Sequence, residues 1–467
     1  MLEFINTYIL GNLTPVFLMA AGIYFLFRLK FFYIRHPIKV LSAMLEKNKS
    51  AGISPFRAVT LALAGTLGVG NIVGVASAIA MGGYGAIFWM WVSALLAMIL
   101  KYAEIVLAVS HRRTDPVSGE HYGGAMYYIR DLFNCRGHEL CGILLAGVFA
   151  LFCIINSLTM GCVVQINAIS RSFMGVFDLS PVLIGAATAL VCVFIISGNA
   201  KKISGFTEKI IPVITLGYLG VSVAALSARP DQIGDAFRVI FEQAFDFRSA
   251  AGGVLGFMFS RAMRLGSMRG LMSNEAGCGT APTAHAASDT NSPSKQGFWG
   301  IFEVFVDTIV LCTITALVII IGRVDGYEND PMMMTIKAYS SLLGDWSSYF
   351  ICFSVLLFGV STIICWAHYG KECVRYLSKS KTLQTIFIIV FTLFIFIGAV
   401  SAPESIWNAA DFALGIMTVI NVPVLCAMSG EVVVQTERFL KSAAVNRGNR
   451  KSLNKLNTKT DGEKTES

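Results

Sequence analysis

The segment at residues 61–80, LALAGTLGVGNIVGVASAIA, constrains the fold most, because it is apolar throughout and carries no charge. Its length suits the roughly 30 Å hydrocarbon core of a bilayer. Four glycines cluster in it around Thr66 and Asn71, namely Gly65, Gly68, Gly70 and Gly74. Glycine costs about 1 kcal/mol relative to alanine inside a helix. The cluster therefore predicts a membrane-spanning segment whose backbone is not helical near its middle.

These glycines also fit a second interpretation. Small residues spaced four apart, such as Gly70 and Gly74, let two membrane helices pack closely. A dinucleotide-binding loop is excluded, since such a loop follows a strand in a βαβ unit. Non-helical backbone at membrane depth occurs where it lines a cavity or is buried in protein. If the break is real, it predicts a binding site for substrate and cation at residues 65–71.

The composition is that of a polytopic membrane protein. Of the 467 residues, 55% are hydrophobic and only 14% are charged, against roughly 25% charged in a soluble domain. The apolar spans number eleven and lie at 12–29, 57–80, 85–110, 142–168, 181–198, 208–227, 248–264, 298–321, 348–369, 382–400 and 406–430. The span at 248–264 is the weakest, because it is short and glycine-rich. We therefore predict an all-α protein with about eleven transmembrane helices.

Lysine and arginine gather in every second connection between the spans. Such connections face the cytoplasm, so the N-terminus is expected outside the cell membrane and the C-terminus inside. The net charge of +8 follows from this placement, and no nucleic-acid partner is expected. The eleven cysteines show no metal-ligand spacing, so no resident cofactor is expected. The tail at 436–467 is polar and is expected to be disordered.

A second glycine-interrupted segment lies five spans after the first. It reads GSMRGLMSNEAGCGTAP at 266–282 and is polar at its centre. Interrupted spans at corresponding places in two halves indicate the inverted repeat of secondary transporters. We therefore expect repeats at 57–228 and 229–435, preceded at 1–56 by an extra helix and a basic cytoplasmic segment.

The two interrupted segments carry the expected chemistry. At 65–71, freed N–H groups would attract a carboxylate and freed carbonyls would bind a small cation. The polar run at 273–279 would form the opposite wall of the same site. On its own, this run is equally typical of a cytoplasmic loop that precedes a capped helix.

Ser361 and Thr362 lie in the middle of a later span. Such a pair usually hydrogen-bonds to its own helix. Alternatively, the two hydroxyls join unwound carbonyls at 65–68 in an all-oxygen cage for Na⁺. Trp366 lies one turn after Thr362 on the same helix face and would cap a small pocket.

Charged residues inside spans are functional candidates by default, and here they include Glu303, Asp307 and Asp411. Lys101 and Glu104, three residues apart, are expected to form a pair at the membrane interface. His285 is expected to be structural. The sequence has no nucleophile and base in an arrangement that would support an enzyme.

At these residues the sequence resembles the alanine or glycine:cation symporter family, the sodium–alanine symporters. The resemblance covers nearly the whole chain. The matching stretches are GTLGVGNIVG at 65–74, AIFWMW at 86–91, KYAE at 101–104, TEK at 207–209, SNEAG at 273–277 and APTAH at 281–285, with Asp307, Thr308, Phe358, Ser361, Thr362 and Trp366. The resemblance implies a leucine-transporter-type fold of ten core helices plus one. It also implies Na⁺-coupled uptake of small neutral amino acids such as alanine and glycine, by alternating access.

The resemblance further implies roles for individual residues. The substrate pocket would be lined by Thr66, Gly68, Gly70, Asn71, Gln165, Met272, Ser273 and Trp366. The Na⁺ site would combine Ser361 and Thr362 with backbone oxygens near Gly65 and Gly68. Met272 departs from the family, which usually has phenylalanine before the SNEAG motif. Because this departure lies near the pocket, it bears on which amino acid is carried.

Two functions of other classes fit the same fold. An ion channel would pass Na⁺ without an amino acid, and a membrane amino-acid sensor would bind the amino acid without flux. The expected partners are the lipid bilayer, Na⁺ and a small neutral amino acid. The residues leave open the oligomeric state and the use of H⁺ in place of Na⁺.

Overall fold

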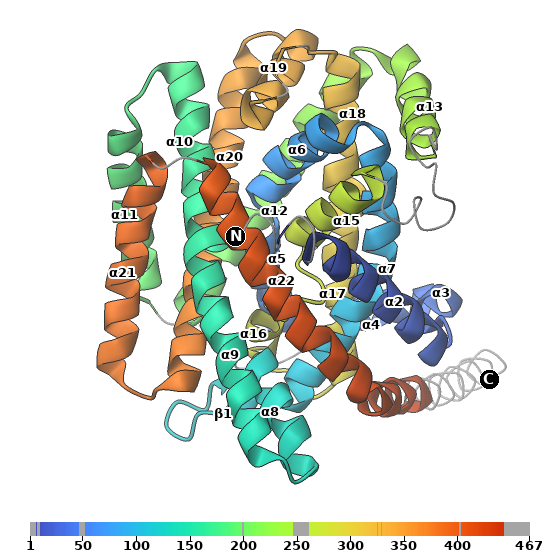
Figure 1. Ribbon diagram of the computed structural model, residues 1–467, viewed down its shortest axis with the longest axis vertical. Coiled ribbons are helices and arrows are strands. Elements are labelled where there is room, and N and C mark those ends of the chain that lie inside the picture. Colours follow the sequence, from blue (N-terminus) through green and yellow to red (C-terminus); the bar gives the residue numbers. More distant parts are fainter. Residues whose placement is uncertain are drawn as a thin grey trace, which may run out of the picture.

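The structure is a computed structural model that describes residues 6, 10–45, 52–198, 200–245, 261–324, 326–327, 329–400 and 403–442. It is built almost entirely of helices (Figure 1), as the all-α prediction requires. One two-stranded antiparallel sheet pairs β1 (Arg113–Thr114) with β2 (His121–Tyr122). Of the predicted tail, residues 436–442 are helical, and 443–467 lie outside the described residues, as does most of the predicted span 248–264.

The helices follow the predicted spans along the chain. In the first half they are α2 (Gly11–Arg28), α3 (Phe32–Arg35), α4 (Pro37–Met44), α5 (Pro55–Thr66), η2 (Val69–Asn71), α6 (Val73–Gly82), α7 (Gly85–Ser110), α8 (Ala125–Cys135), α9 (Glu139–Leu158), η3 (Thr159–Val163), α10 (Val164–Phe177), α11 (Pro181–Ile196) and α12 (Ala200–Ser227). In the second half they are η4 (Pro230–Gln232), α13 (Ile233–Ala244), α15 (Arg261–Asn274), α16 (Ala281–Ala286), α17 (Pro293–Val304), η6 (Phe305–Cys312), α18 (Thr313–Gly322), α19 (Pro331–Leu343), α20 (Trp346–Leu377), α21 (Lys381–Val400) and α22 (Pro403–Ala427).

Several of these helices are long and apolar enough to cross a bilayer. Within the described ranges there are seven, at Gly85–Ser110, Glu139–Phe177, Ala200–Ser227, Pro293–Gly322, Trp346–Leu377, Lys381–Val400 and Ile406–Ala427. Shorter apolar helices lie at Leu13–Arg28, Val73–Gly82 and Pro181–Ile196. The chain thus has the helices of a multi-pass membrane protein, while the full number of eleven crossings and the inverted repeat stay predictions.

The first glycine cluster breaks its helix. Ser54 caps the start of α5 by accepting a hydrogen bond from the N–H of Arg57 at 3.2 Å, and Pro55 occupies the first helical position. The helix ends at Thr66, after which Leu67 and Gly68 adopt non-helical backbone angles. A short 3₁₀ turn, η2, then leads into α6. The glycines therefore mark an interruption between two half-helices, as their number predicts.

The second glycine-rich segment is also interrupted. Helix α15 ends at Asn274, and Glu275, Gly277 and Gly279 follow with positive φ angles of 53°, 85° and 83°. Glycine takes such angles without strain, which explains its use in this turn before α16. Figure 1 shows α5, α6 and α15 in the interior of the molecule, whereas α11 and α21 pack together at one edge.

Helix α7 is held between α15 and α17 through glycines on both neighbours. A Cβ atom at Gly266 of α15 would overlap the carbonyl oxygen of Ala86. On the other side, a Cβ atom at Gly300 of α17 would overlap the side chain of Ile105. Gly266 therefore lets the backbones of α15 and α7 approach closely, and Gly300 leaves room for the Ile105 side chain between α17 and α7.

Candidate functional site

The break after α5 lies directly against α20 and α10. A Cβ atom at Gly68 would lie 2.7 Å from Oγ1 of Thr362 and 2.9 Å from Oε1 of Gln165. Only glycine fits this approach without moving one of the two side chains. The structure therefore brings together three residues that sequence reasoning assigned to the site, although they are far apart in the chain.

Thr362 of α20 contacts the C-terminal end of α5. Its Oγ1 lies 2.9 Å from the carbonyl oxygen of Ala64 and 3.4 Å from that of Leu67, and it also lies 2.9 Å from the carbonyl oxygen of Phe358 in its own helix. The carbonyl oxygens at a helix C-terminus carry partial negative charge. The carbonyls that Thr362 reaches are those next to Gly65 and Gly68, the positions expected from the sequence.

Ser361 behaves differently from its neighbour. Its Oγ donates within α20, with the carbonyl oxygens of Leu357 and Phe358 each at 2.8 Å. Hydrogen bonding within its own helix is one of the two arrangements that the sequence allows for the Ser361 and Thr362 hydroxyls. In this conformation Thr362, and not Ser361, joins α20 to the break.

The substrate residues predicted on η2 and α10 are in contact. The N–H of Val69 donates to Oε1 of Gln165 at 3.0 Å, and Nε2 of Gln165 donates to the carbonyl of Met160 at 3.2 Å. Within the break, the N–H of Gly68 donates to Oδ1 of Asn71 at 3.2 Å. The amide of Gln165 thus faces the first N–H of the turn that leads into α6.

Asn71 connects the first interrupted segment to the second. Its Nδ2 donates to Oγ of Ser273 at 3.0 Å and to Oδ1 of Asp307 at 2.7 Å, and Ser273 in turn donates to Oδ2 of Asp307 at 2.8 Å. Gly70 lies beside them, since a Cβ there would be 3.5 Å from the Cα atom of Ser273. All of these side chains are buried. Ser273, the first residue of the predicted opposite wall at 273–279, therefore contacts the segment 65–71.

Trp366 and Met272 lie at the edges of this arrangement. The indole ring of Trp366 is fully buried against Gly161, where a Cβ atom would overlap it, and its Nε1 has no hydrogen-bond partner among the described residues. The buried Sδ of Met272 lies 2.8 Å from Nη1 of Arg269. Gly161 belongs to η3, a π-helical turn that joins α9 to α10, and such turns are frequent at functional sites.

The expectation that Lys101 and Glu104 form an interfacial pair is wrong. Both side chains are completely buried, and Nζ of Lys101 lies 3.2 Å from Oε1 of Glu303. Glu104 instead accepts hydrogen bonds from the N–H of Gly279 at 2.9 Å and from Nδ2 of Asn421 at 2.6 Å. The i, i+3 spacing favoured a local pair, but the partner of the lysine comes from α17.

Glu303 connects further parts of the site. Its Oε2 lies 3.1 Å from Nε2 of His285, and its Oε1 lies 3.4 Å from the hydroxyl of Thr66 at the end of α5. Nζ of Lys101 also donates to the carbonyl of Asn274, the last residue of α15, at 2.7 Å. One buried ion pair thus contacts the C-terminal ends of both half-helices, α5 and α15, that precede the breaks. Sequence reasoning named Glu303 but did not find its partner.

Comparison with known proteins decides the family. A model of the sodium:alanine symporter family matches residues 1–454. The chain belongs to the sodium:alanine symporter family. Among its relatives are the sodium/alanine symporter AgcS of Methanococcus maripaludis, which is 34% identical over 93% of this chain and 96% of its own, and a probable sodium/glutamine symporter, GlnT, of Bacillus subtilis, which is 35% identical over 93% and 89%.

Solved structures support the fold of this family member. A manganese transporter from Eremococcus coleocola matches with a TM-score of 0.52 over 81% of this chain and 78% of its own, at 12% sequence identity. At this identity the match concerns the fold alone. The chain is therefore a multi-pass membrane protein of a transporter family with a fold shared by other transporters.

Proposed function

We propose that this protein is a secondary symporter that couples Na⁺ entry to the uptake of small neutral amino acids by alternating access. The observation that carries the proposal is the contact of Thr362 with the carbonyl oxygens of Ala64 and Leu67, beside a break whose backbone N–H groups at Gly68 and Val69 bind the side chains of Asn71 and Gln165. Entry of Na⁺ supplies roughly 2.3 kcal/mol per 100 mV of membrane potential, in addition to its concentration gradient.

The proposed Na⁺ site lies at the C-terminal end of α5. Its ligands are Oγ1 of Thr362 and backbone oxygens of residues 64–68, among them Gly65 and Gly68. Ser361 joins this set when its hydroxyl turns from its own helix toward the break. Hard cations prefer such oxygen ligands, and the partial negative charge of the half-helix end adds to the attraction.

The proposed amino-acid site lies between the two interrupted segments. The N-terminal end of α6 carries partial positive charge, which suits the carboxylate of an amino acid. Side chains of Asn71, Gln165 and Ser273 surround it, with Gly70 allowing close approach. Thr66, Met272 and Trp366 complete its walls. The names of the relatives, which include alanine and glutamine symporters, support a small neutral amino acid as the substrate class.

The proposed topology places the N-terminus outside and the C-terminus in the cytoplasm. Repeats at 57–228 and 229–435 would be related by inversion in the membrane. The two interrupted segments lie against each other through Asn71 and Ser273. This contact is what an inverted repeat with a shared central site requires.

The test is transport in proteoliposomes that contain the purified protein. We expect labelled alanine, glycine or glutamine to accumulate under an inward Na⁺ gradient, and not under an equal gradient of choline or of protons alone. A sodium ionophore should abolish the accumulation. Na⁺ flux in the absence of any amino acid would indicate a channel, and Na⁺-dependent binding without flux would indicate a sensor; either result would overturn the proposal.

A further inference from the structure

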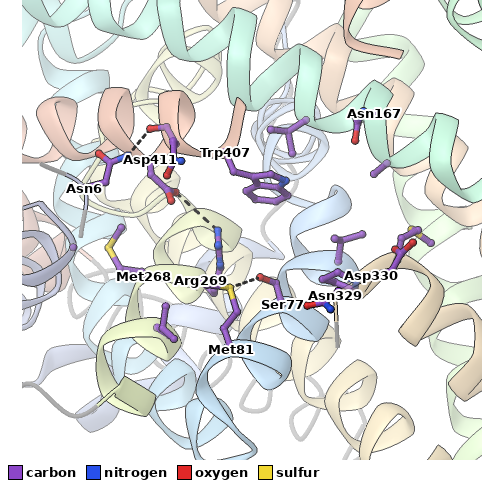
Figure 2. Close-up of a pocket in the computed structure, with 18 of the residues that line it drawn as sticks. Asn6, Ser77, Met81, Asn167, Met268, Arg269, Asn329, Asp330, Trp407 and Asp411 are labelled. Atoms are coloured by element: carbon purple, nitrogen blue, oxygen red, sulfur yellow. Dashed lines mark hydrogen bonds and ion pairs between the residues drawn. The ribbon is translucent and has the colours of Figure 1, made fainter. Parts of the chain in front are cut away.

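A large cavity lies next to the central site and opens to the surface. Its volume is about 790 Å³, and residues of α6, α10, α15, α19 and α22 line it. Figure 2 shows Arg269, Asp411 and Trp407 grouped on its wall, with Met81 and Ser77 beside them. An amino acid occupies only a small part of such a volume, so the cavity is an antechamber and not a tightly fitted pocket.

The charges that line the cavity are mostly positive. Four arginines and two aspartates contribute to its lining. Arg171 is paired with Asp330 at 3.6 Å, but Arg261 and Arg264 have no ion-pair partner within 4 Å among the described residues. A cleft with one dominant sign of charge raises the local concentration of oppositely charged groups. The cavity therefore attracts carboxylates.

The pair formed by Arg269 and Asp411 is loose. Nη1 of Arg269 lies 3.9 Å from Oδ1 of Asp411, beyond hydrogen-bonding distance, and that oxygen has no hydrogen-bond partner in the described part of the chain. Both side chains are largely buried, with 11% and 20% of their surfaces exposed. The guanidinium group also lies over the ring of Trp407, 4.9 Å from its centroid. Oδ1 of Asp411 thus keeps free hydrogen-bonding capacity toward the described residues while it faces a guanidinium group whose Nη1 contacts only the weakly accepting sulfur of Met272 at hydrogen-bonding distance.

We propose that Arg269 and Asp411 form an outer subsite for the zwitterionic head of an α-amino acid. Its carboxylate binds Arg269 and its ammonium group binds Asp411, so that both charges gain charge-assisted hydrogen bonds. The inference rests on the proposed function in one respect, which is that the same amino acid then moves on to the central site. Recognition by this pair needs neither Na⁺ nor a particular side chain, because the surrounding cavity is wide.

The outer subsite is joined to the central site through α15. Nη1 of Arg269 lies 2.8 Å from the sulfur of Met272, and the next residue, Ser273, hydrogen-bonds to Asn71 in the break. A zwitterion that draws Arg269 away would release Met272 from this contact. The substrate therefore binds first at the outer subsite, which recognises its charged head group, and then at the central site, which recognises its side chain.

The test measures protection of a cysteine placed in the cavity. Met81 lines the cavity and is 43% exposed, so Met81→Cys is a suitable reporter for a membrane-impermeant thiol reagent. Of the native cysteines, the two exposed ones, Cys135 of α8 and Cys141 of α9, are replaced by serine in all samples. Ser341→Cys, exposed on α19 and absent from the cavity lining, is the matched control.

We expect alanine in Na⁺-free medium to slow modification of Met81→Cys at least about threefold and to leave the control unchanged. Leucine should protect as well as alanine, whereas propionate and alaninamide, each of which lacks one charge of the zwitterion, should not. Adding Asp411→Asn should raise the half-protecting alanine concentration by about tenfold or more, as expected for loss of one charge-assisted hydrogen bond.

The outcomes separate the two proposals. Absence of protection, or equal protection by propionate or alaninamide, would overturn the outer subsite even if Na⁺-driven uptake is observed. Protection by zwitterions with no Na⁺-driven uptake in proteoliposomes would overturn the proposed symport and leave the outer subsite standing. Protection that Asp411→Asn and Arg269→Gln both leave unchanged would place the bound zwitterion elsewhere in the cavity and would also overturn the inference.

Discussion

Nζ of Lys101 and Oε1 of Glu303 lie 3.2 Å apart, and neither side chain has any surface exposed. Removing two charges from water costs several kcal/mol for each ion, and only good geometry with further hydrogen bonds repays that cost. Here those bonds come from the carbonyl of Asn274, which accepts from the lysine, and from His285, which faces the carboxylate. The pair therefore ties α7 and α17 to both interrupted segments.

Replacing Lys101 by methionine should destabilise the protein strongly. The change leaves Glu303 buried without its cation, which typically costs about 3–5 kcal/mol. The double variant Lys101→Met with Glu303→Gln should recover much of that loss, because no uncompensated charge is left. Thermal unfolding in detergent measures both. As a control, Arg57→Met removes the partly exposed pair with Glu208 and should cost no more than about 1 kcal/mol; equal losses for the two single variants would contradict this prediction.

Replacing Thr362 by alanine should weaken Na⁺ binding. Loss of one oxygen ligand inside the protein leaves a buried polar interaction unsatisfied, which costs about 1–3 kcal/mol. This corresponds to a roughly tenfold to hundredfold decrease in Na⁺ affinity. Because coupling between two ligands is reciprocal, the amino-acid concentration for half-maximal uptake should rise at low Na⁺ and return toward wild type at high Na⁺. Thr392→Ala, which removes a hydroxyl that donates only to the carbonyl of Ile388 in its own helix, is the control. An identical Na⁺ response of wild type and Thr362→Ala would place the cation elsewhere.

Replacing Met272 by phenylalanine should change which amino acids are preferred. Methionine is flexible and adapts to ligands of different shape, whereas a phenylalanine ring is rigid and removes the sulfur that contacts Arg269. We expect larger substrates such as glutamine to lose more affinity than alanine or glycine. Competition against labelled alanine uptake gives the ranking. If transport is intact and the ranking is the same as in wild type, Met272 does not line the substrate site.

Replacing Gly161 by alanine should displace Trp366. The added Cβ atom would overlap the indole ring, and overpacking of this kind costs about 1–3 kcal/mol. Both the unfolding temperature and the apparent affinity for the amino acid should fall. Gly205→Ala in α12 is a matched control, because a Cβ there meets nothing within 4 Å and alanine favours the helix. A Gly161→Ala variant as stable and active as this control would disprove the close contact.

The stability of the protein should fall at alkaline pH through His111, which follows the end of α7. Burial lowers the pKa of His111, but hydrogen bonds to Asp131 and Glu431 outweigh this and raise the pKa to about 9. The protonated form is therefore stabilised by folding, fully so below about pH 6.5. Its contribution, up to about 3 kcal/mol, is lost as the pH rises through 9.

Unfolding temperatures at pH 6.5 and pH 9.5 measure this effect. His111→Gln should be less stable than wild type at pH 6.5 and should show a smaller decrease between the two values. His121→Gln, which removes a histidine outside this pair of hydrogen bonds, should keep the wild-type difference. If the unfolding temperature of His111→Gln falls between pH 6.5 and pH 9.5 as much as that of wild type, the pH dependence belongs to another group.

The local sequence predicted where the helices are interrupted, whereas the pairing of side chains between helices depends on tertiary contacts. The glycines at 65–74 predicted an interruption within 65–71, with close helix packing as the alternative, because the cost of glycine in a helix depends on local backbone alone. The structure places the end of α5 at Thr66. Contact of Thr362 with the break was one of two alternatives for its mid-span hydroxyl, and the family resemblance, not the local sequence, favoured it. The partner of Lys101 was not predicted, since pairing between spans depends on how helices are arranged in space. For the same reason, the sequence named Asp411 but gave no indication that Arg269 faces it.

The glycines at 266 and 300 limit how this protein can move. Gly266 brings α15 against the backbone of α7 at Ala86, and Gly300 brings α17 against the Ile105 side chain of α7, so sliding of either helix along α7 would meet these groups. In the proposed alternating-access cycle, these three helices would therefore move together as one rigid unit. The hinges of that cycle would then fall at the unwound residues 67–68 and 275–280, which are also the residues nearest the proposed ligands, so that binding and bending would take place at the same bonds.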